Sequence, residues 1–573
     1  MKNIVRRDGV VNNLPNNFHP VLKRVLANRG VKEASELDYS LKNLLLYSTL
    51  SGIDKAVNLL YTAMVKQDRI LIVADFDADG ATSCTLAINA LKKMGAKKVG
   101  FVVPNRKEHG YGLRPEIVEL IDKLPLMTTT EAGTGSDLLV TVDNGISSHT
   151  GVEAAKQRGM KVIITDHHEP GYKLPAADAI VNPKQPGDNF PSKNLCGVGV
   201  IFYVMLALRV HLRDNNWFKD IPEPNLAEYL DLVALGTVAD VVSLDYNNRI
   251  LVEQGLRRIQ ANNCCSGIRA LIQEAQRDQA NLVASDLAFY LGPRLNAAGR
   301  MDDMSYGIAC LLCEDDLIAK QHTKLLQIFN QERRVEEAKM NQEAIDMLDI
   351  DKVDSFGLCL LDENWHQGVT GILASRIKDR LHRPVIIFTH GTNTTIRGSG
   401  RSVSGVNIRD VIDTIATKNP NMVIHFGGHA MAAGLTIQRD QFVTFQQAFD
   451  QEISKFLSSN ELHGVIFSDG ELTTNDFNLN LAEKLRKLTP WGHDFPEPIF
   501  DGEFELVDHK ILKERHLKMQ VRPIGGGQII DAIAFNTGNI ELNTTQVRLA
   551  YRLDINIFRG KKRLQLMVEY VES

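Results

Sequence analysis

Three short apolar runs in the first third of the sequence each end in acidic residues, and one of them also ends in two histidines. The polar residues at these run ends are Asp75, Asp77, Asp79, Asp143, Asn144, Asp166, His167 and His168. One such ending fits an ordinary polar turn. Three endings in one sheet would crowd many carboxylates together, and these repel one another unless a cation neutralises them. The pattern therefore predicts a divalent metal site.

The types of ligand narrow the choice of metal. Oxygen ligands with one or two imidazoles and no thiolate favour Mn²⁺ or Mg²⁺ over a structural zinc ion. The acids suffice for two ions, an arrangement that clamps the attacking and leaving oxygens in phosphoester hydrolysis. A calcium loop is the alternative for DFDADG, but the glutamate of the twelve-residue EF-hand pattern is absent. The chain also lacks G-x-x-x-x-G-K-[ST], so we expect no nucleotide cofactor.

The elements that carry these residues alternate between strand and helix from about residue 51. The runs RILIVA, KVGFVV, LLVTV and KVIIT are separated by helical segments, which is typical of a parallel α/β sheet. Ligands of such sheets bind beyond the C-terminal ends of the strands. The three acidic run ends are thus expected to meet at one crevice.

The rest of the chain divides by pattern and composition. We expect an N-terminal helical segment at 1–50, a parallel-sheet domain at 51–313, a long exposed connector helix at 314–350, a second α/β domain at 351–458 and an OB-type β-barrel at 459–573. The segment TTTEAGTGSD, residues 128–137, is predicted to be a surface loop.

Composition limits the class of protein. A chain of 573 residues needs more than one core, and its net charge of −5 means that a polyanion must meet local basic patches or bound metal. Seven cysteines indicate a reducing compartment, and we expect Cys310 and Cys313, without a second pair, to be core residues. The N-terminus lacks the apolar core of a signal peptide, and Leu195–Leu208 is short for a bilayer span. We expect a cytoplasmic protein without a membrane partner.

Four motifs, in this order, resemble those of the DHH phosphoesterase superfamily: DFDADGATS, VDNG, DHH and LGTVADVV. Within it, further segments resemble the RecJ family of bacterial single-strand-specific 5′→3′ DNA exonucleases: PNRKEHGYGL, LGPRLNAAGRMDDM, WHQGVTGILASRIKDR, RGSGRSVSGVNIRD and FGGHAMAAGLT. The resemblance covers nearly the whole chain and implies DHH, DHHA1 and RecJ OB domains. Ala74 and Phe76 depart from the Gly and Tyr common in that family, but neither change removes a ligand.

The resemblance implies hydrolysis of single-stranded DNA from its 5′ end by two metal ions, Mn²⁺ or Mg²⁺, with release of nucleoside 5′-monophosphates. The metal ligands that it implies, with Asp143 as bridge and Asp75 in or just outside the set, are Asp75, Asp77, Asp79, Asp143, His167 and Asp240. Asp166 and Asn144 would support them, and His168 would face the scissile phosphate as charge stabiliser or proton donor. By residue type alone, Asp240 could be an ordinary helix-end residue.

Basic and glycine-rich segments each have a plainer alternative. RGSGRS could be a tight turn, whereas the resemblance favours an anion site with Arg106, Ser399 and Arg401 on the terminal 5′-phosphate. The further DNA contacts that it implies are Arg294, Arg300, Arg397, His425, Gly427, Gly428 and His429, where solvated arginines and a packed turn are the alternatives. In the barrel, either a single-strand groove or a solvated strand edge would contain Lys513, Arg515, His516, Lys518, Phe558, Lys561, Lys562 and Arg563.

The resemblance also implies roles in recombinational repair and mismatch repair, with single-strand-binding protein and a RecQ-type helicase as partners. Two rival functions stay open: another DHH phosphoesterase, acting on oligoribonucleotides or small nucleotides, and a non-catalytic single-strand-binding scaffold. The barrel disfavours the first because small substrates need no extended groove. A scaffold predicts eroded metal ligands, whereas every position is filled here.

Overall fold

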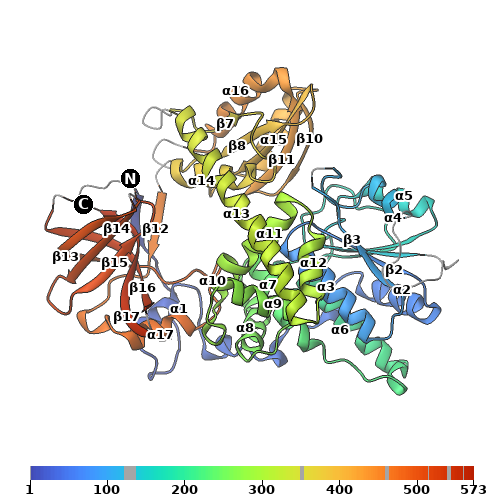
Figure 1. Cartoon of the computed structure of the whole chain (residues 1–573), viewed down its shortest axis with the longest axis horizontal. Helices are drawn as coiled ribbons and strands as arrows, with labels where there is room; N and C mark the ends of the chain where they lie inside the picture. Colours follow the sequence, from blue (N-terminus) through green and yellow to red (C-terminus); the bar gives the residue numbers. More distant parts are fainter. Residues whose placement is uncertain are drawn as a thin grey trace. The chain divides into compact units, whose positions relative to one another are not determined.

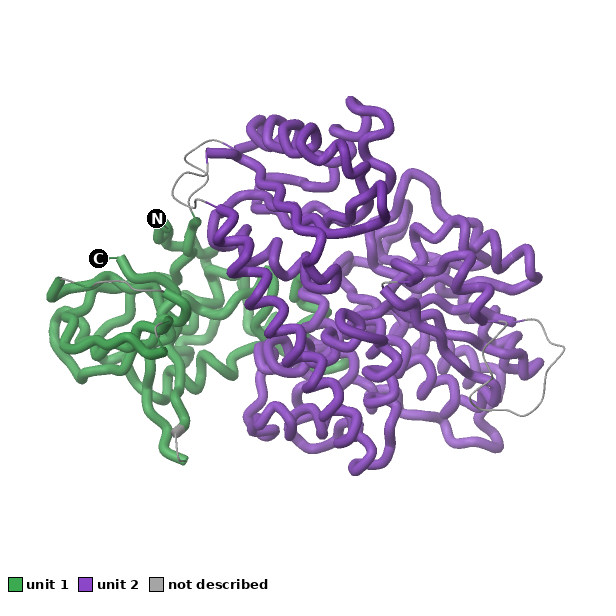
Figure 2. Tube along the Cα trace, turned by 45° about the horizontal axis from the view of Figure 1, so that its top comes forward, with its two compact units in different colours: residues 1–43, 243–249, 463–573 green, residues 44–242, 250–462 purple. Residues whose placement is uncertain are grey.

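The predicted parallel sheet is present in the computed structural model (Figure 1). The structure describes residues 2–106, 108–121, 137–348, 354–457, 464–513, 515–537, 542, 544–558 and 560–572. The loop predicted at 128–137 lies outside these residues except for Asp137, and so do the domain boundaries predicted near 350 and 458. The chain clusters into a barrel unit, residues 1–43, 243–249 and 463–573, and a main unit, residues 44–242 and 250–462 (Figure 2).

The first sheet of the main unit has the strand order β3-β2-β4-β5-β6, and all of its pairs are parallel. Its strands are β2 (Ile70–Ala74), β3 (Val99–Val102), β4 (Leu138–Val142), β5 (Lys161–Thr165) and β6 (Ala179–Val181). Its helices are α2 (Ile53–Lys66), α3 (Ala78–Lys93), α4 (Pro115–Ile121), α5 (His149–Gln157) and α6 (Gly197–Asp214). Figure 1 shows α4 and α5 on one face and α2, α3 and α6 on the other.

Burial on both faces explains why these strands are mostly apolar. Every residue of β2 and β4 is buried, and Leu71, Val73 and Leu139 join the core beneath α4 and α5. The apolar run Leu195–Leu208 forms most of the buried helix α6, as predicted. Within the described ranges, no helix combines the length and apolar content that crossing a bilayer requires.

A helical layer follows this sheet. Its elements are α7 (Leu230–Ala239), α8 (Tyr246–Gln260), α9 (Ser266–Glu274), α10 (Ala284–Asp286), a π-helical turn (Leu287–Leu291), α11 (Gly292–Met301) and α12 (Ser305–Leu312). The predicted connector is α13 (Asp316–Met347), whose start is capped by the Asp315 carboxylate through the N–H groups of Leu317 and Ile318. Cys310 is buried in α12, and Cys313 is half-buried, with its Sγ 3.2 Å from the Asp315 carbonyl oxygen.

The second α/β domain has the strand order β10-β11-β9-β8-β7. Its elements are β7 (Leu358–Leu361), α14 (Thr370–Leu381), β8 (Val385–His390), β9 (Thr395–Arg401), α15 (Ile408–Lys418), β10 (Val423–Gly428), β11 (Ala432–Gln438) and α16 (Phe442–Ile453). Only β7 and β8 pair in parallel; the other pairs in this sheet are antiparallel. The edge strand β10 is mostly exposed.

In the barrel unit, five strands close in the order β13-β14-β15-β17-β16, which confirms the predicted barrel. They are β13 (Phe500–Leu512), β14 (His516–Pro523), β15 (Ile530–Ala534), β16 (Gln546–Phe558) and β17 (Lys561–Glu572). Helices α1 (Pro20–Ala27) and α17 (Leu479–Lys487) belong to the same unit.

The prediction of a helical segment at 1–50 holds for α1 but misses a strand. Strand β1 (Lys2–Arg6) pairs in parallel with β12 (Gly464–Ser468). Its partner lies more than 450 residues away in the sequence, so no local pattern announces the pairing. Among the described residues, short 3₁₀ turns lie at Ala34–Leu37, Leu41–Asn43, Tyr47–Thr49, Trp217–Lys219, Leu226–Tyr229, Gln279–Asn281, Arg439–Gln441 and Thr474–Asp476.

Candidate metal and phosphate site

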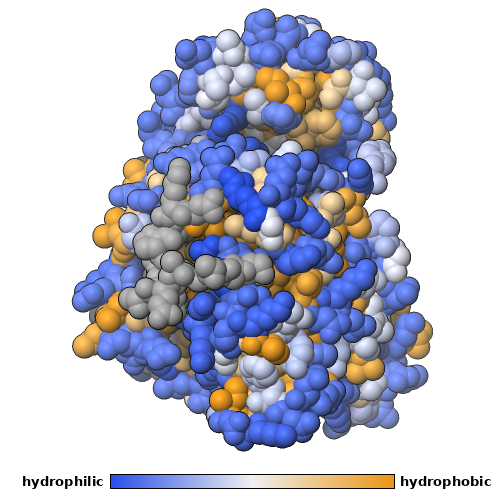
Figure 3. Space-filling view, turned by 90° about the vertical axis from the view of Figure 1, so that its right-hand side faces the viewer, coloured by the Kyte–Doolittle hydropathy of each residue, from blue (hydrophilic) through white to orange (hydrophobic). Residues whose placement is uncertain are grey.

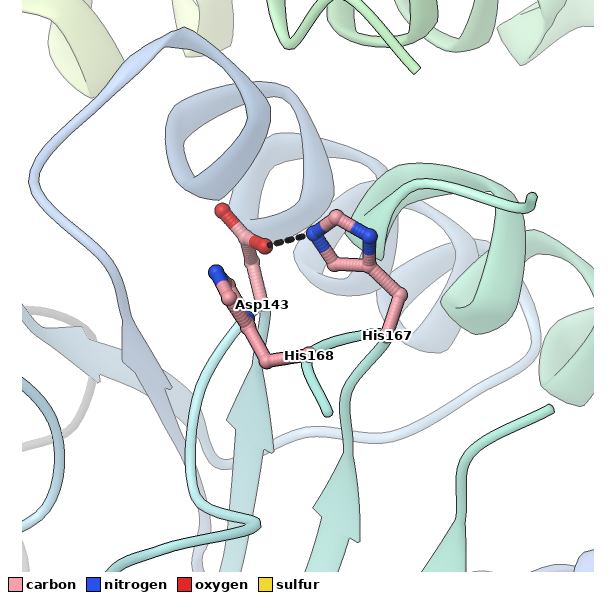
Figure 4. A group of neighbouring side chains, drawn as sticks. All are labelled: Asp143, His167 and His168. Carbon is pink, nitrogen blue, oxygen red and sulfur yellow. Dashed lines mark ion pairs between the residues drawn. The ribbon is translucent and has the colours of Figure 1, made fainter. Parts of the chain in front are cut away.

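The acidic ends of β2, β4 and β5 meet because these three strands are direct neighbours in the sheet. Potential ligand atoms form three overlapping groups, each within 4.8 Å: Asp75, Asp77 and Asp143; Asp79, His167 and Asp240; and Asp143, His167 and His168. The last group is drawn in Figure 4, where Asp143 and His167 point toward each other from adjacent strand ends. The three acidic strand ends therefore lie close together, as the sequence predicted.

His167 is the centre of this cluster. Its Nε2 lies 3.1 Å from Asp143 Oδ1, 3.4 Å from Asp240 Oδ2 and 3.9 Å from Asp79 Oδ2. Burial lowers the pKa of His167 well below its usual value, so the ring is neutral and offers a lone pair.

The cluster fits a divalent cation by its chemistry and spacing. Buried oxygen and nitrogen atoms are left without a hydrogen-bond partner among the described residues: Asp75 Oδ1, Asp143 Oδ1, and both ring nitrogens of His167. Such atoms are costly unless something else satisfies them. Two ligands at right angles on a cation such as Mg²⁺ lie about 3 Å apart, close to the 3.1 Å between His167 and Asp143.

Without a cation, burial and mutual repulsion raise the pKa values of four of these carboxylates. Burial, reinforced by the charge of Asp77, raises the pKa of Asp75 to about 8 and that of Asp79 to about 7. Burial followed by neighbouring carboxylates also raises the pKa of Asp143 and of Asp240 well above the usual value. A bound cation would reverse this preference by favouring the charged forms.

Local backbone structure fixes two of the acids. Asp77 caps α3, and its Oδ1 accepts hydrogen bonds from the N–H groups of Asp79 (3.0 Å) and Gly80 (3.1 Å). Asp79 accepts from the N–H groups of Gly197 (2.5 Å) and Val198 (2.8 Å), at the start of α6. Both contacts hold a negative charge at a helix N-terminus, where the helix dipole favours it.

Asp143 adopts a left-handed backbone, with φ of 63°. A residue with a side chain rarely holds this conformation, and such strain is concentrated at functional sites. Gly197 packs directly against it, because a Cβ at Gly197 would lie 2.5 Å from the Cβ of Asp143. Asn144, beside it, is buried and donates to the carbonyl oxygens of Val73 and Val142, which ties β4 to β2.

Asp166 belongs to none of the three ligand groups and instead holds the backbone beside them. Its Oδ2 accepts from Ile146 N–H at 2.8 Å, and its Oδ1 from the N–H groups of His167 (2.7 Å) and His168 (3.1 Å). Burial alone would raise its pKa, but the neighbouring His168, His167 and these hydrogen bonds outweigh it and hold the pKa well below the usual value. The acid is therefore ionised.

His168 belongs to the same cluster, because one of its ring nitrogens lies within 4.8 Å of ligand atoms of Asp143 and His167. Although burial acts to lower its pKa, Asp166 outweighs it and raises the pKa to about 9. The ring of His429, at the end of the β10–β11 hairpin, stacks on it with centroids 5.2 Å apart. The second α/β domain thus brings His429 to the site, where the resemblance predicted a substrate contact.

Tyr111 is a site residue that sequence reasoning missed. Its Oη lies 3.3 Å from the carbonyl oxygen of Asp143 and 3.2 Å from His168 Nδ1. Its ring also meets Phe76 edge to face. The only signal was its place in PNRKEHGYGL, where a tyrosine between two glycines resembles any exposed turn.

A second group of residues beside the cluster is positively charged. Arg106 lies over the Phe76 ring, 4.0 Å from its centroid. Burial, then the like charges of Arg106 and Arg401, lowers the pKa of Arg300 to about 9. Among the described residues, none of the three forms an ion pair with a carboxylate, which leaves them available to an anion.

Ser399 and Arg401 lie at the start of α14. A Cβ at Gly371 would be 2.9 Å from Ser399 Oγ and 2.8 Å from Arg401 Nη2. Arg397, Ser399 and Arg401 alternate along β9 and so share one face of the strand. The structure therefore brings Ser399 and Arg401 together beside a helix N-terminus, as an anion site requires.

The other predicted DNA contacts are more scattered. Arg294 is buried, with its guanidinium on the Tyr290 carbonyl oxygen at 2.5 Å, and Arg397 donates to Gln367 at 3.2 Å. His425, Gly427 and Gly428 lie exposed on the edge strand β10. In Figure 3, hydrophobic residues gather on the upper lobe of the face shown, above a hollow bordered by hydrophilic ones.

The basic residues of the barrel unit fall into two groups. Lys513, Arg515, His516 and Lys518 surround the β13–β14 turn, and Lys561, Lys562 and Arg563 begin β17. In the strand register, Lys518 pairs with Ile533, and Ile533 pairs with Met567. Because Met567 lies six residues after Lys561 on β17, the two basic groups are about 20 Å apart along the strands. Lys518 and Lys562 already face Asp531 and Glu483. The side chain of Phe558 lies outside the described residues.

Comparison with known proteins agrees with the fold and with this cluster. Residues 69–237 match the DHH family N-terminal domain, 354–455 match the DHHA1 domain and 468–570 match the RecJ OB domain. The parallel sheet with its acidic strand ends thus defines a protein of the DHH class.

Full-length relatives narrow this class. The chain is 50% identical to the single-stranded-DNA-specific exonuclease RecJ of Dickeya dadantii, over 99% of this chain and 98% of that protein. It is 49% identical to the Escherichia coli protein of the same name, over 97% and 96%. The crystal structure of Thermus thermophilus RecJ in complex with Mn²⁺ matches with a TM-score of 0.79 and 27% identity, covering 100% of this chain and 80% of that one. The chain belongs to the RecJ family.

Proposed function

We propose that this chain is a metal-dependent exonuclease that degrades single-stranded DNA from the 5′ end and releases nucleoside 5′-monophosphates. The observation that carries the proposal is the juxtaposition of two groups of side chains: a cluster of buried acids around His167, and arginines beside Ser399 that form no ion pair with a carboxylate among the described residues. The first suits a cation and the second suits a phosphate. Membership of the RecJ family, whose named members act on single-stranded DNA, supports the choice of substrate.

The residues that would hold two divalent ions, Mn²⁺ or Mg²⁺, are Asp75, Asp77, Asp79, Asp143, His167 and Asp240. Asp143 and His167 each belong to two of the three ligand groups, and of the two only the Asp143 carboxylate has two oxygens that could bridge two ions. Bound there, the ions would polarise the phosphodiester and lower the pKa of the attacking water. Related RecJ structures contain Mn²⁺ and Mg²⁺.

His168 would act on the phosphate through Nε2. Its Nδ1 is 2.7 Å from Asp166 Oδ1, and because that carboxylate is ionised, Nδ1 carries the proton of this contact. Nε2, whose contact with Tyr111 Oη is a long 3.5 Å, can then donate a hydrogen bond to a non-bridging oxygen as charge develops. Tyr111 and His429 enclose the ring and limit its rotation.

The group of Arg106, Ser399 and Arg401, called here the phosphate pocket, would set the direction in which the strand is digested. Arg106, Ser399 and Arg401 would bind the terminal 5′-phosphate, since guanidinium groups and a hydroxyl beside a helix N-terminus suit a dianion. With that phosphate held, the first phosphodiester bond reaches the metal cluster, and one nucleotide leaves in each cycle. A 3′ end carries no terminal phosphate to occupy this pocket.

The remaining strand would contact the second α/β domain and the barrel. The residues proposed there are Arg294, Arg300, Arg397, His425, Gly427, Gly428 and His429, with Lys513, Arg515, Lys518, Phe558, Lys561, Lys562 and Arg563 in the barrel. Because Arg294 is buried and the basic groups of the barrel are separated, we expect Arg300 and His429 to dominate. Roles in repair, and cooperation with single-strand-binding protein and a RecQ-type helicase, stay predictions from the family.

Digestion of matched single-stranded and blunt duplex DNA tests the proposal. The wild-type chain with Mn²⁺ is expected to convert the single strand to mononucleotides and to leave the duplex intact. Asp77→Ala is expected to digest neither. Equal digestion of both substrates, or full activity of Asp77→Ala, would contradict the proposal.

A further inference from the structure

One face of α11 lies against the loop that carries the first metal ligands. Asn296, Gly299 and Arg300 occupy positions i, i+3 and i+4 of this helix, so their side chains share a face. The Asn296 Oδ1 accepts a hydrogen bond from the N–H of Ala78 at 2.8 Å. Ala78 stands between Asp77 and Asp79, two of the proposed ligands.

This hydrogen bond completes the N-terminus of α3. The first N–H groups of a helix have no partner inside the helix. Asp77 Oδ1 accepts those of Asp79 and Gly80, and Asn296 accepts that of Ala78. Because Oδ1 of Asp77 is engaged twice, its Oδ2 is the oxygen left for a cation.

Gly299 holds the same loop from its carbonyl side. A Cβ at this position would lie 1.9 Å from the Phe76 carbonyl oxygen, so the helix backbone touches the loop directly. The loop of residues 75–78 is therefore fixed at two points by a single helix face: at its Phe76 carbonyl and at its Ala78 N–H.

Arg300, one position further along, links this face to the second α/β domain. Its Nη1 donates to the Gly368 carbonyl oxygen at 3.1 Å, and a Cβ at Gly368 would lie 2.3 Å from the Arg300 carbonyl oxygen. Gly368 is three residues before Gly371, which packs on Ser399 and Arg401. Helix α11 thus spans the distance between the metal cluster and the phosphate pocket.

We propose that Asn296 is a positioning residue of the metal site: by accepting the Ala78 N–H, it holds the Asp75–Asp79 loop in the conformation that binds cations. It would touch neither metal nor DNA. The inference deepens the proposed function and rests on it. Supporting residues of this kind affect metal affinity or activity by about 10–100-fold when they are replaced.

The test compares two replacements of similar size. Asn296→Leu removes the acceptor oxygen, and Asn296→Asp keeps it. The full-length variants are titrated with Mn²⁺ by calorimetry, and their folding is checked by circular dichroism and thermal unfolding. We expect Asn296→Leu to weaken Mn²⁺ binding by about 10–100-fold, and Asn296→Asp to match the wild type or to bind more tightly. In hydrolysis, Asn296→Leu should lower kcat and leave the KM for DNA unchanged.

A matched control distinguishes an effect on the metal site from the loss of stability that follows the removal of any helix cap. Asn478 caps α17 in the barrel unit through the Leu481 N–H at 2.9 Å, and Asn478→Leu should cost stability without changing Mn²⁺ affinity. A folded Asn296→Leu chain that binds Mn²⁺ as tightly as the wild type would overturn the inference, and so would an Asn296→Asp chain as weak as Asn296→Leu. If Asn296→Leu does not fold, Asn296→Ala makes the same comparison without added bulk. A wild type that binds no Mn²⁺ would overturn the proposed function and this inference with it.

Discussion

Nδ1 of His168 lies 2.7 Å from Oδ1 of Asp166, and this contact decides which ring nitrogen faces the metal cluster. An orienting carboxylate fixes the tautomer and ring orientation of a histidine. The variant Asp166→Asn lacks the negative charge. Its amide can either donate to or accept from Nδ1 of His168, so it no longer fixes the proton on that nitrogen. We therefore expect kcat to fall by about 100-fold or more, whereas Mn²⁺ affinity, measured by calorimetry, stays near that of the wild type.

His168→Ala serves as the reference for that prediction. If Asp166 acts through His168, the double variant should be no slower than His168→Ala alone, since residues that act as a unit are not additive. Additive losses in kcat would show that Asp166 has a separate role, such as holding the backbone through the Ile146 N–H.

Mn²⁺ is expected to stabilise the folded chain, because it relieves the repulsion among the buried carboxylates. At a hundred times its Kd, a cation that binds only the folded state adds about 2.7 kcal/mol. Thermal unfolding should show a higher Tm with Mn²⁺ than with EDTA, and Asp143→Asn should lose most of this difference. Asp413→Asn, an exposed acid of α15, should retain it in full. Equal shifts in both variants would argue against the cluster as the binding site.

Arg401→Met tests the phosphate pocket. Removal of one of its guanidiniums should raise the KM for 5′-phosphorylated single strands, because a charge-assisted contact of about 1.5–3 kcal/mol is lost. Strands with a 5′-hydroxyl should be affected much less. Arg409→Met, which neutralises an arginine at the start of α15, provides the control. An equal loss on both substrates would place Arg401 on the DNA backbone instead of the terminal phosphate.

Acid is expected to weaken the barrel unit through Asp501. Burial alone would raise its pKa, but hydrogen bonds from Arg6, Ser468 and Arg548 outweigh it and lower the pKa to about 2. Because the folded pKa lies below the unfolded value, the stabilisation is present above about pH 4 and lost as the pH falls toward 2. It amounts to about 2 kcal/mol.

Urea unfolding from pH 3 to 7 measures this contribution. Asp501→Asn should be less stable than the wild type by a constant amount near neutrality, and the gap should narrow below pH 4. A gap that is independent of pH would assign the effect to lost packing.

Much of the fold could be predicted because local patterns encode it. The runs that form β2, β4 and β5 are mostly apolar, as is typical of buried parallel strands. The strand β1 escaped prediction because five residues near the N-terminus pair with a segment beyond residue 460. β6, only three residues long, gives too short a pattern to detect.

The candidate site likewise contains residues that local sequence patterns predict and residues that they do not. The acids at the strand ends could be predicted from their residue type and position. Asp240 and His429, in contrast, reach the cluster only through tertiary folding. Tyr111 and Asn296 had no chemical signal of their own, because a tyrosine and an asparagine are ordinary surface residues until their partners are known. The two basic groups of the barrel looked like one groove in sequence, and only the strand register separates them.

The most direct test of the central claim follows both ends of one strand. A 5′-phosphorylated single strand carries different labels on its first and last nucleotides and is digested by the wild-type chain in Mn²⁺ without ATP. The account predicts that the 5′ label appears first, as a mononucleotide, and that EDTA stops its release. Earlier release of the 3′ label, or digestion that continues in EDTA, would contradict it.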